Sequence, residues 1–412
     1  MQTKRRTFRK KFNSHSSTPF KRRSGGGGRF QKRQRPVTTF NPQQFINKNP
    51  QEIAPEVYEA THTFKDFSFA EQINKNLHFN SLITPSPIQD QSIPHILSNK
   101  DIVGLAQTGT GKTAAFLLPL IQKNVEQNKK YTTLILTPTR ELALQIQDEC
   151  TKLGRGLGMQ SVCCVGGVPI RPQIMALKKH VPFIIGTPGR IMDLIDRKVI
   201  NPKGFKAVVL DEADRMLDMG FIHDMRSILG ATNPDRHTIF FSATMPESAK
   251  KLVAEFLNDP VHISVKKKDV TNSIAQDIVV YEKDSKFDTL VTLLNTPSCS
   301  RAIIFGAMKR SVSQLAKDLM KAGIIADSIH GDKTHHQRQQ ALRRFKSGAT
   351  KVLVATDVAA RGIHVDDVSH VINYDLPNCF EDYVHRIGRT GRGTKKGQAI
   401  TFVEKSTVGA RR

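Results

Sequence analysis

The chain has 412 residues, 38% of them hydrophobic, which allows two or three globular domains. Its 62 Lys and Arg against 37 Asp and Glu give a net charge of +25, which favours polyanionic partners. No apolar run could span a bilayer and the basic start "MQTKRRTFRKKF" lacks the apolar centre of a secretory signal, so we expect an intracellular, cytoplasmic protein that binds no membrane. The five cysteines are odd in number and contain no C-x-x-C pair, which argues against a disulfide framework and against a zinc site.

The amino-terminal segment is strongly basic. Residues 1 to 51 contain 14 Lys and Arg and no acidic residue, leaving 48 basic against 37 acidic residues in the rest of the chain. Isolated phenylalanines and a four-glycine run occur here without apolar periodicity, so we expect residues 1–48 to be a disordered basic tail. Arginines that neutralise phosphates and rings that stack on unpaired bases favour a nucleic-acid-binding arm, and a solubilising tail is the alternative.

From about residue 60 short apolar runs alternate with helical stretches. The first set is "DIVGL", "TTLILT", "VPFIIG", "KAVVLDE" and "HTIFFSA"; the second is "RAIIFG", "IADSIH", "KVLVAT", "HVINYD" and "QAITFV". Buried strands that alternate with helices predict an α/β fold with a mainly parallel sheet flanked by helices. A charged connector separates the two sets, so we expect tandem domains at residues 60–266 and 274–405, followed by a short tail at 406–412.

A glycine-rich turn follows the first predicted strand. Its glycines let backbone N–H groups point at an anion, and a helix N-terminus adds partial positive charge, so the turn is typical of a phosphate-binding loop. Lys112 would reach the terminal phosphates and Thr113 would offer its hydroxyl to Mg²⁺. The loop consists of Ala106, Gln107, Thr108, Gly109, Thr110, Gly111, Lys112 and Thr113, with Ala106 where the strict pattern has glycine.

A pair of carboxylates ends a later strand of the same predicted domain. In "AVVLDEADRM", four apolar residues lead into Asp211 and Glu212. We expect Asp211 to bind Mg²⁺ and Glu212 to orient and deprotonate the attacking water. Such a pair is common after a strand, but its position about a hundred residues after the phosphate loop makes the interpretation much stronger.

Seven motifs together resemble the DEAD-box RNA helicases, over roughly residues 64–405. They are "AQTGTGKT", "PTREL", "TPGR", "DEAD", "SAT", "ARG" within "ATDVAARGI", and "HRIGRTGR", in the order and approximate spacing of that family. The resemblance implies two RecA-like domains that close over ATP and single-stranded RNA.

The resemblance assigns the ATP contacts beyond the loop. Gln89 in "TPSPIQ" would recognise adenine, since an amide matches both its donor and its acceptor edge. An upstream aromatic, Phe64, would pack on the base, with Phe67 competing for the role and a plain core position as the alternative. Gly362 of "ARG" would belong to the same ATP site.

The resemblance also implies residues that couple the two domains. Ser242 and Thr244 of "SAT" would hydrogen-bond Asp214, the last residue of "DEAD", and His385 would bridge to the "DEAD" segment. Arg389 and Arg392 would act as arginine fingers on the γ-phosphate, because guanidinium is permanently charged and bidentate toward phosphate. Direct binding of RNA phosphates by this cluster, which includes His385 and Arg386, is the alternative.

The expected RNA contacts lie in loops of both domains and fall on sugar and phosphate, so they would provide affinity without reading sequence. These residues are Arg140, Gly166, Gly167, Thr187, Arg190 and Thr356.

Two positions depart from the family's pattern. His364 stands where the family usually has an aspartate associated with the ATP ribose, which puts nucleotide affinity in doubt or makes it sensitive to pH. The alternative is that His364 faces solvent and Asp366 or Asp367 takes over the role. His335 replaces the glutamine of a Gln-x-x-Arg pair, whose arginine, Arg338, is present.

We therefore expect an ATP-dependent RNA helicase that uses ATP and Mg²⁺, binds single-stranded RNA without sequence specificity and locally unwinds short duplexes. An RNA clamp and an RNA annealer acting through the tail are the alternatives. Intact Lys112, Glu212, Arg389 and Arg392 argue against a clamp that cannot hydrolyse ATP. The sequence does not name the RNA, the pathway or the protein partners.

Overall fold

The computed structural model describes residues 46–47, 58–107, 109–265, 274–282, 284–360, 365, 367–377, 379–391 and 397–405. The predicted tails at 1–48, apart from 46–47, and at 406–412 lie outside these residues, as does nearly all of the connector at 265–273. Thr108, Gly362, His364 and Arg392 lie outside them too.

The first sheet of the described chain has seven strands, all parallel, in the order β3-β4-β2-β5-β6-β1-β7. All five strands that the sequence predicts for this domain are present, and the two edge strands, β3 and β7, are additional. The strands are β1 (Ile102–Leu105), β2 (Thr133–Leu136), β3 (Ser161–Cys164), β4 (Phe183–Gly186), β5 (Ala207–Leu210), β6 (His237–Ser242) and β7 (Val261–Ser264).

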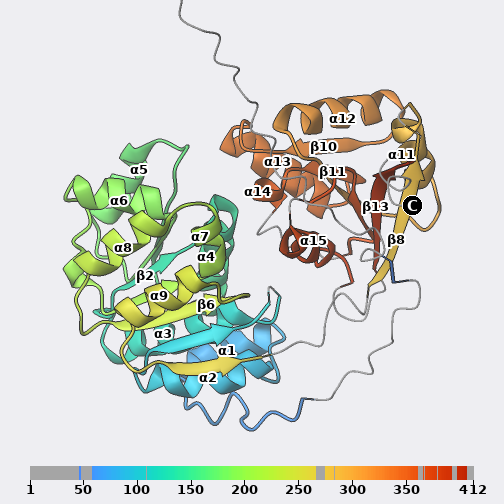
Figure 1. Ribbon diagram of the computed structural model, residues 1–412. Coiled ribbons are helices and arrows are strands. Elements are labelled where there is room, and N and C mark those ends of the chain that lie inside the picture. The colour runs from blue at the N-terminus through green and yellow to red at the C-terminus, as the bar shows by residue number, and fades with distance from the viewer. Residues whose placement is uncertain are drawn as a thin grey trace, which may run out of the picture. The chain divides into compact units, whose positions relative to one another are not determined.

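Helices cover both faces of this sheet (Figure 1). One face packs against α1 (Glu71–Phe79), α2 (Pro87–Leu97), α3 (Lys112–Glu126) and α4 (Arg140–Leu153). The other packs against α6 (Pro188–Asp196), α7 (Ala213–Asp218), α8 (Ile222–Ala231) and α9 (Glu247–Phe256). The remaining helical elements of this part are α5 (Ile170–Leu177) and the short 3₁₀ helix η2 (Pro202–Gly204).

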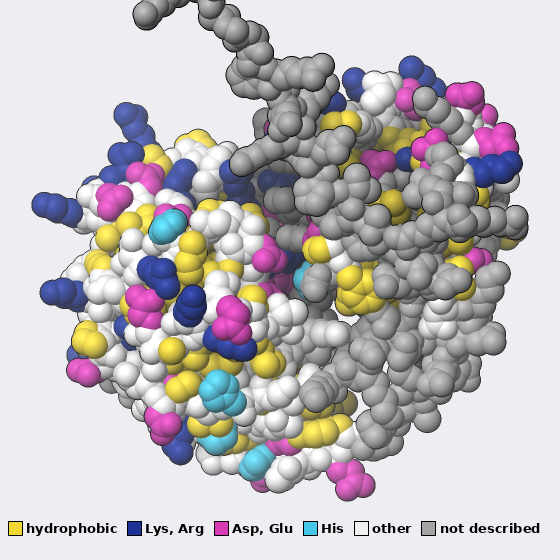
Figure 2. Space-filling model, in the orientation of Figure 1, with side chains coloured by type: hydrophobic (Ala, Val, Ile, Leu, Met, Phe, Trp, Pro, Cys, Tyr) yellow, Lys and Arg dark blue, Asp and Glu magenta, His cyan; other side chains and the backbone are white. Residues whose placement is uncertain are grey.

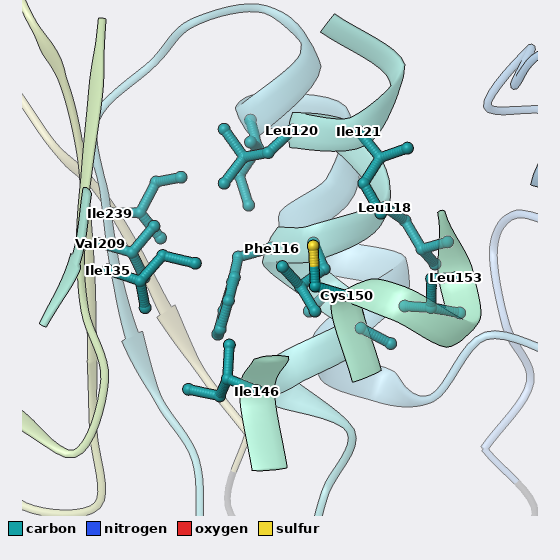
Figure 3. Close-up of a cluster of buried hydrophobic side chains, with 14 of the residues drawn as sticks. Phe116, Leu118, Leu120, Ile121, Ile135, Ile146, Cys150, Leu153, Val209 and Ile239 are labelled. Atoms are coloured by element: carbon teal, nitrogen blue, oxygen red, sulfur yellow. The ribbon is translucent and has the colours of Figure 1, made fainter. Parts of the chain in front are cut away.

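The buried position of α3 fixes the phosphate loop. Phe116 of α3 is fully buried and points toward Ile135, Val209 and Ile239 of three neighbouring strands (Figure 3). A ring of this size buries more apolar surface than any aliphatic side chain, so it locks the helix against the sheet. The first turn of α3 is thereby held at the end of β1.

The second sheet, as described, has six parallel strands in the order β10-β11-β9-β12-β13-β8. All five predicted strands are present, and the edge strand β8 is additional. They are β8 (Ala275–Tyr281), β9 (Ala302–Phe305), β10 (Ala326–Ile329), β11 (Val352–Ala355), β12 (His370–Asn373) and β13 (Gln398–Glu404).

Helices also cover this sheet. On one face α11 (Lys286–Leu294) and α12 (Lys309–Lys321) share a core with the strands, and on the other face α13 (His335–Lys346) does. The short α14 (Asp357–Ala360) follows β11, and α15 (Phe380–Ile387) contributes to a smaller cluster with Ala399. The predicted α/β class, with two mainly parallel sheets flanked by helices, is confirmed, while the exact domain boundaries stay a prediction.

Candidate functional site

The strand register gathers the predicted site of the first domain at one edge of its sheet. Leu136 of β2 lies opposite both Gly186 of β4 and Leu210 of β5, and Leu105 of β1 lies opposite Ser242 of β6. The residues that follow these strand ends therefore emerge side by side, as ligand sites do in parallel α/β sheets.

The two ends of the phosphate loop are joined by a hydrogen bond in this structure. Lys112, the first residue of α3, is buried and donates from Nζ to the carbonyl oxygen of Ala106, 2.8 Å away. Gly109 and Gly111 have φ angles of 83° and 93°, a region that side-chain-bearing residues avoid. The predicted loop is thus formed around a buried ammonium group at a helix N-terminus.

Gln89 contacts the phosphate loop through its side chain. Its Oε1 accepts from the backbone N–H of Ser86 at 2.9 Å, and its Nε2 donates to the carbonyl of Gly111 at 3.1 Å. Ser86 in turn donates from Oγ to the carbonyl of Thr110 at 2.8 Å. The Ser-x-x-Gln spacing is the sequence signal of a helix capping box, which we did not draw from the sequence.

Phe64 and Phe67 both belong to the hydrophobic core of the first domain. Their side chains are buried, and their rings meet edge to face with centroids 6.2 Å apart. Because the two rings are neighbours and both are buried, the structure does not distinguish Phe64 from Phe67 as the ring that packs on adenine. That role stays a prediction.

Asp211 and Glu212 follow β5 directly and are almost completely buried. Glu212 has a φ of 52°, a left-handed conformation that is costly for a residue with a side chain and is often found at functional sites. Its carboxylate pairs with the guanidinium of Arg215 one turn later, and its Oε1 is buried without a hydrogen-bond partner among the described residues.

Electrostatics separate the two carboxylates. Burial raises the pKa of Asp211 to about 6, although the nearby Lys112 charge opposes the rise. Burial would also raise the pKa of Glu212, but the charges of Arg215 and Lys112 outweigh it and lower that pKa to about 2. At neutral pH Glu212 is therefore firmly ionised. The ionised form of Asp211 is less favourable, and a further positive charge nearby would stabilise it.

A single pocket brings the loop, the acid pair and Gln89 together. One wall comes from α4, of which only Leu142 belongs to a predicted motif, "PTREL"; the amide of Gln145 on this wall is buried without a described hydrogen-bond partner. The first-domain residues that line the pocket are Leu82, Gln89, Gly109, Gly111, Lys112, Thr113, Ala114, Leu142, Gln145, Asp148, Glu149, Lys152, Asp211 and Glu212.

The "DEAD" and "SAT" segments are hydrogen-bonded to each other. Oδ2 of Asp214 accepts from both the hydroxyl and the backbone N–H of Thr244, at 2.9 and 2.8 Å. Ser242 is also involved, but its Oγ accepts from the backbone N–H of Asp214 at 3.2 Å and does not contact the carboxylate.

Four of the predicted RNA-binding residues lie close together after β2, β3 and β4. The side chain of Arg140 lies against Gly167, where an added Cβ would overlap its guanidinium group, and beside Gly166. Arg190 donates to Oε1 of Gln173 at 3.0 Å, and Gln173 donates to the carbonyl of Val165 at 3.1 Å. Gln173, which we did not predict, therefore ties Arg190 to the glycine-containing loop.

Thr187 and Thr356 both follow strands. Thr187 precedes α6, and its N–H donates to the carbonyl of Cys164 at 3.2 Å. Thr356 follows β11 in the second domain and is buried, with its N–H 3.3 Å from the carbonyl of Ile329.

In the second domain, the basic motif begins in the last turn of α15 and continues beyond it. Arg389 is buried and donates from Nε to the carbonyl of His385 at 3.2 Å. Arg386 is also buried and forms a bidentate pair with Asp357, at 2.6 and 2.8 Å, with its guanidinium 5.0 Å from the ring of Phe305. The alternative of direct RNA binding is therefore wrong for Arg386, which holds the domain together; the finger roles stay predictions.

The described residues place no group of three or more His, Cys, Asp or Glu side chains where they could hold a metal ion. All five cysteines lie among them, and none forms a disulfide with another. Within the same residues, every helix is too short or too polar to cross a membrane.

Two family descriptions match the chain. The DEAD/DEAH box helicase family matches residues 86–252, and the helicase conserved C-terminal domain matches residues 285–394. The solved structure of Saccharomyces cerevisiae Dbp5 bound to RNA and ADP BeF3 is 30% identical, with a TM-score of 0.75 and coverage of 84% of this chain and 90% of that chain. Mss116p bound to ssRNA and AMP-PNP is also 30% identical with a TM-score of 0.75, covering 83% and 74%.

Curated relatives are more similar to this chain in sequence than these two solved structures are. The DEAD-box ATP-dependent RNA helicase CshA of Bacillus subtilis is 46% identical over 354 residues, which are 85% of this chain and 72% of the relative. CshA of Geobacillus kaustophilus is 44% identical over 348 residues, or 84% and 74%. Given these matches and the site geometry, the chain belongs to the family of DEAD-box ATP-dependent RNA helicases.

Proposed function

We propose that this protein hydrolyses ATP when it binds single-stranded RNA and uses the cycle to separate short RNA duplexes locally. The observation that carries this proposal is the common pocket of the first domain, where buried Lys112 lies beside the Asp211 and Glu212 carboxylates. The relatives named as ATP-dependent RNA helicases and the neighbours solved with RNA support the same assignment.

The residues of the pocket divide the chemistry among them. Lys112 holds the Ala106 carbonyl here, and phosphate oxygens of ATP would replace that acceptor and gain a charged partner. Glu212 is ionised at neutral pH, so it can accept a hydrogen bond from the attacking water, orient it and take its proton. Arg389, with Arg392, would add positive charge at the γ-phosphate from the second domain.

The donors of the pocket fit a magnesium ion. Thr113 and Asp211 both line it, and hydroxyl and carboxylate oxygens are ligands that suit Mg²⁺, which commonly keeps waters and uses only one or two carboxylates. Burial and the neighbouring Glu212 carboxylate raise the pKa of Asp211 despite the Lys112 charge, so a bound cation would stabilise its ionised form. When bound, Mg²⁺ would neutralise charge on the phosphates.

RNA would be bound at the strand-end loops of both domains, by Arg140, Gly166, Gly167, Thr187, Arg190 and Thr356, through sugar and phosphate. On the face that Figure 2 shows, Lys and Arg side chains of the described residues are interspersed with Asp and Glu. A mixed surface of this kind does not attract RNA strongly over long range, so we assign much of the electrostatic affinity to the 14 basic residues of the predicted tail.

Phosphate release at saturating ATP, with and without single-stranded RNA, tests the hydrolytic part. We expect strong stimulation by RNA of any sequence, because RNA must help the two domains to close. Displacement of a labelled strand should be efficient for short duplexes and weak for long ones. Equal phosphate release with and without RNA would overturn the proposal.

Salt titrations of RNA binding test the tail separately. Each lost phosphate contact should lower the slope of log affinity against log salt by roughly 0.7 for single strands. Removing residues 1–48 should therefore flatten the slope while strand displacement remains. Identical slopes for the full chain and the truncated chain would contradict the proposal that residues 1–48 bind RNA.

A further inference from the structure

The carboxylate of Asp90 binds a segment that precedes the conserved motifs. Its Oδ2 accepts from the hydroxyl of Tyr58 at 2.6 Å and from the backbone N–H of Thr61 at 2.8 Å. Its Oδ1 accepts from the backbone N–H of His62 at 3.1 Å and contacts Nδ1 of the same residue at 2.7 Å. Since an ionised carboxylate only accepts, Nδ1 carries a proton, and all four contacts come from donors.

This cluster is built for an ionised carboxylate. Asp90 is 1% exposed, and an unpaired carboxylate at that depth would be costly. Burial alone would raise the pKa of Asp90, but the hydrogen bonds from Tyr58, His62 and Thr61 outweigh it and lower the pKa. An asparagine of the same shape would direct its amide N–H groups at two of the donors, so it cannot replace the carboxylate.

Asp90 adjoins the predicted adenine-binding residue. It lies next to Gln89 in the first turn of α2, and Gln89 and Ser86 of that turn contact the carbonyls of Gly111 and Thr110 in the phosphate loop. The same turn thus connects segment 58–62 on one side with the phosphate loop on the other.

Segment 58–62 leads directly into the predicted aromatic residues. The ring of His62 lies 5.5 Å from that of Phe67, which in turn meets Phe64 edge to face. The contact of His62 with Asp90 therefore places its ring against Phe67, at the rim of the core that holds both phenylalanines. Tyr58 and the His62 side chain are more than a third exposed, so their described polar contacts lie mainly with Asp90 and, for Tyr58, also with Gln91 beside it on α2.

We propose that Asp90 is a positioning residue for adenine recognition: by binding segment 58–62 it holds the aromatic residues and Gln89 in one arrangement before ATP arrives. The inference rests on the proposed ATP hydrolysis and adds to it a residue that acts through Phe64, Phe67 and Gln89. Preorganisation of this kind improves binding of the base without changing the chemistry at the phosphates.

The Asp90→Asn variant of the full chain tests this proposal through two readouts. The KM for ATP should rise about tenfold, the effect of losing roughly one charged hydrogen bond, while kcat stays within about twofold. The KM for GTP, whose base does not match the adenine-reading edge, should change much less. Tyr58→Phe, which removes one donor from the segment side, should give a smaller rise of the same kind.

Asp101→Asn is the matched control. Asp101 is another buried aspartate that accepts two backbone N–H groups, from Thr238 at 2.6 Å and Asn258 at 2.8 Å. It should lower the stability of the domain without changing the ratio of KM for ATP to KM for GTP. Equal changes in this ratio for both variants would show that Asp90 acts only through stability, and would overturn the proposal.

Hydrogen exchange at the Thr61 and His62 amides gives a readout that needs no ATP. Asp90→Asn should accelerate exchange there. If exchange accelerates but the KM for ATP is unchanged, the positioning role is wrong and the proposed function stands. If the wild-type chain hydrolyses no ATP, the proposed function fails, and with it the role of Asp90, whatever the exchange shows. Unchanged exchange together with an unchanged KM would also overturn the proposal.

Discussion

Thr244 binds a single carboxylate oxygen of Asp214 through both its hydroxyl and its backbone N–H. The hydroxyl of Ser242 completes the contact from the other direction by accepting the N–H of Asp214 at 3.2 Å. The loop after β6 is thereby attached to the start of α7, whose preceding residue is Glu212. We expect these bonds to couple a displacement of one strand end to the other.

We predict that Thr244→Ala impairs unwinding more than ATP hydrolysis. The variant loses the hydroxyl bond but keeps the backbone bond, so about 1 kcal/mol of coupling is removed while the pocket residues remain. The ratio of strand-displacement rate to phosphate-release rate should fall about fivefold. Thr350→Ala is the matched control, because Thr350 makes a similar buried bond to Asp327 in the second domain, at 2.9 Å. An unchanged ratio in Thr244→Ala would disprove the coupling role.

We predict that Glu212→Gln slows hydrolysis about 10²- to 10⁴-fold while ATP and RNA binding stay near wild type. The amide preserves the shape and can still accept from Arg215, but it cannot take a proton from water. RNA should dissociate more slowly, because the ATP-bound state persists. Single-turnover phosphate release and equilibrium binding of a fluorescent ATP analogue measure the two effects. A wild-type turnover rate would mean that another residue activates the water.

Gly111 and Gly109 form a pair that separates crowding from backbone strain. Both have positive φ, but a Cβ on Gly111 would lie 2.5 Å from Nε2 of Gln89, whereas a Cβ on Gly109 meets nothing within 4 Å. Alanine should cost about 1 to 3 kcal/mol of strain at either position, and at Gly111 it also displaces Gln89. We therefore predict that Gly111→Ala weakens ATP binding at least tenfold more than Gly109→Ala. Equal affinities in isothermal titration would contradict the contact between Gln89 and the loop.

The strands that could be predicted from the sequence are more deeply buried than those that were not predicted. β2, β4 and β5 are buried along their whole length, so each appears as a continuous apolar run. The three strands that were missed, β3, β7 and β8, lie at sheet edges and are only partly buried. In β7 polar and apolar residues alternate, whereas β3 and β8 overlap the short apolar runs "VCCV" and "IVVY", which we did not interpret as strands.

The residues of the candidate site also divide into those that the sequence predicts and those that only the fold identifies. Lys112, Asp211 and Glu212 could be predicted because phosphate and metal chemistry demands those residue types in local patterns. Gln173 and Asp90 could not, because each acts on residues that are distant in sequence and reached only through the fold. Arg386 shows the converse: a basic motif identified it as a candidate RNA ligand, but burial beside Asp357 makes it structural.

His237 makes the stability of the first domain depend on pH. It is the first residue of β6 and donates from Nε2 to the carbonyl of Lys100, 2.7 Å away, while its Nδ1 is buried without a partner among the described residues. Burial is the main reason that its pKa is lowered from 6.5 to about 4; the nearby charge of Lys123 also lowers it, and the bond to Lys100 opposes the fall.

The direction of the effect follows from proton uptake. Between pH 6.5 and about 4 the unfolded chain protonates this imidazole and the folded chain does not, so unfolding takes up a proton and stability falls as pH falls. The contribution is complete above pH 6.5 and lost below about pH 4. At 1.36 kcal/mol per pKa unit it amounts to about 3 kcal/mol.

We predict that His237→Gln flattens this dependence. The glutamine amide can still donate to the Lys100 carbonyl but does not titrate, so the variant should lose less stability than wild type as the pH falls from 7.5 to 4.5. Urea unfolding followed by circular dichroism at several pH values measures both proteins, and the other titrating groups cancel in the difference. Parallel curves for wild type and variant would show that His237 is already protonated, or exposed, in the folded domain.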